Sequence, residues 1–75
     1  MNSMQRKRRI ASHRLQLPHG QVMSQWVVEI QNGKVTNYYP LVGEIAQTEW
    51  WSGLIQLRKD NEDSLCAYYD GKLIE

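Results

Sequence analysis

The chain has 75 residues, 41% of them hydrophobic, with one cysteine and a formal net charge of +1. This length allows one small domain and excludes a large cofactor-binding fold, because only much longer chains form further cores. One cysteine cannot form an internal disulfide, and no Cys/His cluster has metal-ligand spacing. Because so small a core is marginally stable, we expect a partner subunit, most simply in a homodimer.

The basic residues are distributed unevenly along the chain. Four of the nine lie at positions 6–9, whereas residues 10–75 carry five basic and eight acidic groups, a balance of −3. We predict a disordered basic tail over residues 1–7 and a single β-domain over residues 8–75. No apolar run reaches the roughly seven residues of a secretory signal or the roughly 20 residues of a membrane span. Together with a lone thiol, this predicts a cytoplasmic protein without membrane contact.

A β-hairpin is the clearest local pattern. Two β-rich runs, residues 22–31 and 34–39, flank Asn32-Gly33, a pair favoured in type I′ turns. In the simplest register, Ile30 lies opposite Val35, Glu29 opposite Thr36, Val28 opposite Asn37, Val27 opposite Tyr38 and Trp26 opposite Tyr39. The predicted core face comprises Val22, Trp26, Val28, Ile30, Val35 and Tyr39. Val27 and Tyr38 then form an apolar pair on the wet face, which we interpret as a candidate interface with another subunit.

The remaining segments predict further short strands. Residues 8–17 alternate weakly and are assigned to a strand, residues 44–51 to one or two helical turns, and residues 54–58 and 65–69 to strands. A second turn signal, Asp70-Gly71, folds residues 72–74 back as an edge strand, with Tyr68 opposite Leu73. The sequence therefore predicts an all-β, mainly antiparallel domain. It is a small curled meander, β-roll or open barrel of 5–6 strands with one short helix.

Part of the chain resembles known β-domains. The residues concerned run from Gln25 to Val35, with Tyr39-Pro40-Leu41, Glu44-Ile45, Thr48-Glu49-Trp50 and Gly53-Leu54-Ile55. Over residues 8–58 the sequence resembles short uncharacterised bacterial proteins, which implies a stand-alone β-domain, a bacterial cytoplasmic setting and no assigned activity. It is more weakly similar to the small β-domain that flanks the barrel of metal-dependent amidohydrolases. It has no His-x-His motif, so none of that family's metal or catalytic residues has a counterpart here.

No residue pattern predicts catalysis, a cofactor or a metal. His13 and His19 lack a nearby carboxylate, and Cys66, in a predicted strand, is more typical of a small buried hydrophobe than of a nucleophile. Glu44 and Glu49 are more typical of solvent-facing charges than of an acid/base pair. We therefore predict a non-catalytic interaction or structural module. If a site exists, we expect it in a cleft between subunits, with Glu44 or Glu49 facing His13.

A nucleic-acid-binding module is the alternative prediction, with weak affinity. Small β-barrels stack bases on exposed aromatic rings while basic residues follow the phosphate backbone. The basic residues available for this role are Arg6, Lys7, Arg8, Arg9 and Arg14. Against this alternative, the basic groups are concentrated in the tail, and Trp26, Tyr39 and Trp50 are candidates for the core. We therefore place an unidentified protein partner, or a second copy of the chain, ahead of nucleic acid.

Overall fold

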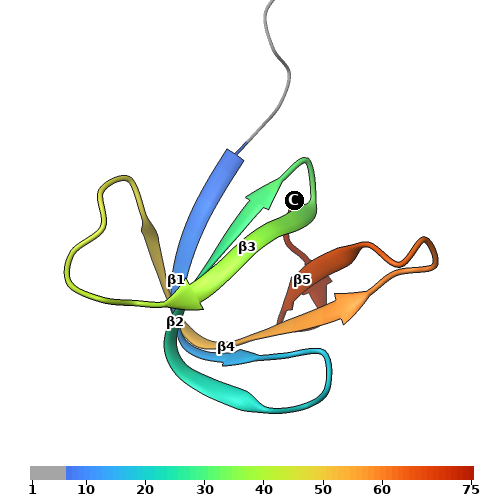
Figure 1. The fold of residues 1–75 in the computed structure, drawn as a ribbon, viewed down its shortest axis with the longest axis horizontal. Helices are drawn as coiled ribbons and strands as arrows, with labels where there is room; N and C mark the ends of the chain where they lie inside the picture. The colour runs from blue at the N-terminus through green and yellow to red at the C-terminus, as the bar shows by residue number, and fades with distance from the viewer. Residues whose placement is uncertain (1–6) are drawn as a thin grey trace, which may run out of the picture.

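A computed structural model describes residues 7–75 of the chain (Figure 1). The described residues form six strands and no helix. The strands are β1 (Lys7–Gln16), β2 (Val22–Gln31), β3 (Lys34–Pro40), β4 (Glu49–Lys59), β5 (Leu65–Tyr69) and β6 (Lys72–Leu73). The predicted all-β class is confirmed. The predicted tail lies almost wholly outside the described residues, and its last residue, Lys7, begins β1.

The strands form one mixed sheet that curls into a half-barrel (Figure 1). Their order is β3-β2-β1-β4-β5-β6. β1 and β4 are parallel, and the other neighbouring strands are antiparallel. The chain is therefore not a simple meander, because the loop after β3 returns β4 to the far side of β1.

The long strands bend near their middle. The pairing of β1 with β4 shifts between Ser12 and Arg14, Gln25 in β2 has a φ of 56°, and Gly53 in β4 has a φ of 103°. A left-handed backbone breaks the regular pleat, so each strand can change direction there. β4 pairs through residues 49–56 with residues 10–16 of β1, and its second half also pairs with β5 on its other side (Figure 1).

The core lies inside the curl. It consists of Ile10, Leu15, Val28, Ile30, Ile55, Leu57, Ala67 and Ile74. Leu17, Trp26, Val35, Tyr38, Trp51, Leu65 and Tyr69 pack against it. The predicted core positions Trp26, Val28, Ile30 and Val35 are confirmed, whereas Val22 is exposed.

The hairpin forms across Asn32-Gly33 as predicted, but its register was only partly predicted. Ile30 does face Val35, and then the pairing shifts by one residue, so that Val28 faces Tyr38 and Val27 faces Tyr39. The extra residue is Thr36, whose hydroxyl donates a hydrogen bond to the Glu29 carbonyl at 3.3 Å. The prediction of Tyr39 on the core face and Tyr38 beside Val27 is therefore wrong, because this bulge exchanges the faces of the two tyrosines.

The predicted helical turns at residues 44–51 are also absent. Residues 41–48 are a loop, and Glu49, Trp50 and Trp51 begin β4. Adjacent tryptophans favour a strand, and β1 offers them a free edge to pair with, so tertiary pairing outweighs local helical propensity. The strand predicted at residues 65–69 and the pairing of Tyr68 with Leu73 are confirmed.

Candidate functional site

The most prominent aromatic group on the outer surface is Trp50. Trp50 is 50% exposed. The His13 ring packs edge-on against its indole, with ring centroids 5.4 Å apart and planes at 63°. His13 also lines a hollow of about 460 Å³ with Arg14, Gly53 and Leu54. The sequence predicted Trp50 as a candidate for the core. The structure places it instead on an open surface formed by β1 and β4.

The backbone beside Trp50 is paired on one side. Glu49, Trp50 and Trp51 pair with β1, whereas β5 pairs with β4 over residues 55–59. Among residues 7–75 no strand pairs with the second edge of residues 49–52. On this side the Tyr69 hydroxyl donates to the Ser52 carbonyl at 2.6 Å, so the edge is open over residues 49–51. This open edge and the Trp50 side chain form the candidate interaction surface, which we call the Trp50 edge.

Behind the Trp50 edge, the inner face is closed by a polar network. The Arg8 guanidinium donates to both carboxylate oxygens of Glu49, at 2.8 and 3.0 Å, and its centre lies 5.5 Å from the centroid of the Trp51 ring. The bond from Arg8 holds the pKa of Glu49 below its usual value, so the pair stays ionised. Trp51 also contacts the ring of Tyr69 edge-on, with centroids 4.9 Å apart. These contacts fix β4 in place.

The predicted interface pair, Val27 and Tyr38, is not on a shared wet face. Tyr38 packs against the core and lies 6.2 Å, centroid to centroid, from Trp26. Val27 is fully buried on the opposite face, beside Ala11. The interface was predicted because the simplest hairpin register puts Val27 and Tyr38 on one exposed face. The bulge at Thr36 changes that register.

The loop of residues 41–48 lies over the face that carries Val27. Arg9 donates to the Ala46 carbonyl at 3.0 Å and pairs with Glu29 at 3.1 Å, and Tyr39 donates to the same Glu29 oxygen at 2.6 Å. Leu41 and Ile45 of this loop line one hollow with Ala11 and Trp50. The loop is therefore held to the outer face of β1, next to Ala11, the residue that pairs with the buried Val27.

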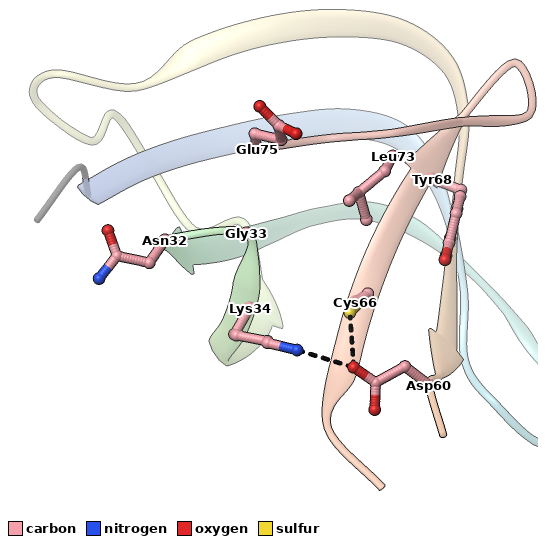
Figure 2. Close-up of a pocket in the computed structure, with 8 residues that line it drawn as sticks. All are labelled: Asn32, Gly33, Lys34, Asp60, Cys66, Tyr68, Leu73 and Glu75. Atoms are coloured by element: carbon pink, nitrogen blue, oxygen red, sulfur yellow. Dashed lines mark hydrogen bonds and ion pairs between the residues drawn. The ribbon is translucent and has the colours of Figure 1, made fainter. Parts of the chain in front are cut away.

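A third hollow, of about 580 Å³, lies between the β2–β3 turn, β5 and the end of the chain (Figure 2). The Lys34 ammonium and the Cys66 thiol both point to oxygen Oδ2 of Asp60, at 2.7 and 3.8 Å. Burial raises the pKa of Cys66. A protonated thiol beside a carboxylate already paired with lysine is poorly suited to nucleophilic chemistry.

The residues considered for chemistry do not come together. His19 contacts Gln21, His13 packs against Trp50, and Glu49 is occupied by Arg8. Within residues 7–75 no group of three or more His, Cys, Asp or Glu side chains is placed to hold a metal ion.

The predicted nucleic-acid contacts are also separated. Arg8 pairs with Glu49 on the inner face and Arg9 with Glu29 on the outer face, because neighbouring residues of a strand point to opposite sides. Arg14 and Lys7 are exposed, and Arg6 lies outside the described residues. This part of the chain therefore presents no continuous basic stripe.

Comparisons with protein-family models, curated proteins and solved structures find no match to this chain. The resemblance to bacterial β-domains therefore stays a prediction. No helix of sufficient length and apolar character to span a membrane occurs within residues 7–75.

Proposed function

We propose that this chain is a non-catalytic interaction module that self-associates through the Trp50 edge. The supporting observation is the half-exposed indole of Trp50 beside a strand segment that pairs on one side. Tryptophan is enriched at the centres of protein interfaces, since its large ring gains much from leaving water and its indole N–H can still find a partner.

The small core supports the same proposal. Eight buried side chains form the core cluster, and the six-stranded sheet does not close on itself. An open sheet leaves strand edges that a further strand can pair with, and a second subunit adds apolar burial that a short chain lacks. We further propose a bacterial, cytoplasmic setting, in which the single thiol of Cys66 stays reduced.

Light scattering behind a size-exclusion column tests the proposal over micromolar concentrations. We expect a species of about twice 8.8 kDa that dissociates on dilution. Trp50→Lys should raise the dissociation constant about tenfold or more, as for loss of an interface tryptophan. The matched control is Val42→Lys, which places the same charge at a loop residue that is 80% exposed. A parent chain that is monomeric throughout would refute self-association.

A further inference from the structure

The hollow beside Trp50 has a volume of about 300 Å³ and is lined by the loop of residues 41–48, β1 and β4. Its apolar walls come from Ala11, Leu41, Ile45 and Trp50, and two carboxylates line it, those of Glu44 and Glu49. This volume is at the lower end of the range for ligand sites. The hollow therefore suits one long side chain and not a whole element of secondary structure.

Glu44 gives this hollow an unbalanced negative charge. Glu49 is paired with Arg8 at 2.8 Å, and Arg9, which also bonds to the loop, is paired with Glu29 at 3.1 Å. Glu44, in contrast, is exposed and makes no hydrogen bond or ion pair within the described part of the chain. A side chain that matches both the walls and the charge of the hollow is a cation on an apolar stem.

The opposite face of β4 shows how such a cation is held. There the Arg8 guanidinium lies 5.5 Å from the centroid of the Trp51 ring and donates to Glu49 at 2.8 and 3.0 Å. Trp50 precedes Trp51 in the strand, so its indole lies on the other face, where Glu44 supplies the carboxylate. Among residues 7–75 no arginine or lysine lies over the Trp50 ring. The outer face thus repeats the indole and the carboxylate of the inner face without the guanidinium.

We infer that this hollow binds an arginine side chain of a partner protein, with the guanidinium over the Trp50 indole and hydrogen-bonded to Glu44. A guanidinium is planar, stacks on aromatic rings and can donate two parallel hydrogen bonds to one carboxylate, whereas a lysine offers a more strongly hydrated point charge. His13 packs edge-on against the indole at 5.4 Å and does not line the hollow, so it steadies the ring and leaves the site open. This inference goes beyond self-association and applies equally to the monomer.

The probe is a short peptide with capped ends and one arginine as its sole charge. The comparison peptide carries citrulline at that position, which keeps the shape and removes the charge. Heteronuclear NMR measures binding at a protein concentration at which light scattering finds the monomer. We expect a dissociation constant on the order of 1 mM, as for a single side chain, and at least about tenfold weaker binding of the citrulline peptide. The indole N–H of Trp50 and the amides of residues 43–45 should shift.

Two variants test the assigned contacts. Glu44→Gln and Trp50→Leu should each weaken binding of the arginine peptide about tenfold, and circular dichroism checks that these changes at exposed residues leave the fold intact. The matched control is Glu62→Gln, which removes the same charge from an exposed residue of the β4–β5 loop and should change the affinity less than about twofold.

Three results would each overturn the inference: equal binding of the arginine and citrulline peptides, equal losses in Glu44→Gln and Glu62→Gln, or shifts centred outside residues 43–50. Light scattering on the chain without peptide measures self-association separately, so either proposal can fail while the other stands.

Discussion

The Lys34 ammonium lies 2.7 Å from the Asp60 carboxylate, and this ion pair joins the β2–β3 turn to the loop between β4 and β5. The other Asp60 oxygen accepts hydrogen bonds from the backbone N–H groups of Glu62 and Ser64, at 2.8 and 2.9 Å. Asp60 thus orders its own loop and closes one end of the half-barrel. The hydrogen bonds, from Lys34 first and then from the Ser64 backbone, lower the pKa of Asp60 from 3.8 to about 2.

Acid should therefore remove the contribution of Asp60 to stability. A carboxyl group whose pKa is lower in the folded chain stabilises the fold above its unfolded pKa, near 3.8, and loses this effect as the pH falls to about 2. We expect Asp60→Asn to unfold at lower denaturant concentration than the parent at pH 6. The difference should shrink between pH 4 and pH 2. Urea titrations at several pH values measure it, and a difference independent of pH would contradict the ion-pair explanation.

The hydrogen bond from Tyr39 to Glu29 should stabilise the chain under the loop of residues 41–48. Tyr39→Phe removes one donor from a carboxylate whose pKa this bond lowers, and we expect a loss of about 1 kcal/mol in the free energy of unfolding. Tyr68→Phe is the control, because the Tyr68 ring lies under the Arg58 guanidinium and its hydroxyl makes no hydrogen bond within residues 7–75. Equal losses in the two variants would argue against a specific role for the Tyr39 bond.

Turn chemistry and strand alternation were enough to predict much of this fold. Asn32 and Gly33 have φ values of 54° and 79°, as an Asn-Gly turn requires, and Asp70 and Gly71 repeat the pattern at 55° and 80°. These preferences are local, so the sequence carries them directly. The pairing of β1 with β4 brings together residues about 40 positions apart, and no local pattern encodes it.

The candidate site could not be predicted from the sequence for a related reason. The bulge at Thr36 lacks the glycine that marks many bulges, and it alone determines which of Tyr38 and Tyr39 faces the core. Likewise, Trp50 and Trp51 look equivalent in sequence, and the parallel pairing with β1 places one outside and the other against the core. Gly53 after the tryptophans was the available signal for a bend in this strand, because glycine inside a strand often marks a bend, and its φ is 103°.

The basic tail offers a direct test of the nucleic-acid alternative. Deletion should stop at residue 6, because Lys7 starts β1 and the Arg8–Glu49 pair lies one residue further on. If binding to single-stranded DNA is electrostatic, the slope of log K against log salt should be no steeper than about −4, and Arg6→Gln with Lys7→Gln should flatten it by about 1 to 2. Tight binding that survives the deletion and the substitutions would favour a nucleic-acid-binding domain over the interaction module.

The Cys66 thiol should react slowly with a neutral alkylating reagent in the folded chain. Burial is the largest cause that raises the pKa of Cys66; the Asp60 carboxylate raises this pKa further, and the Lys34 ammonium lowers it. Removing the charge of Asp60 and removing the charge of Lys34 should therefore change the pKa of Cys66 in opposite directions. Asp60→Asn should speed the reaction of Cys66 with iodoacetamide at pH 8 several-fold, since more thiolate forms, and Lys34→Met should slow it.

Opening of the half-barrel would instead speed the reaction in both variants, because each removes the same contact. Rates measured alongside the urea-unfolded chain separate these effects, and acceleration by Lys34→Met would show that access, and not charge, limits the thiol.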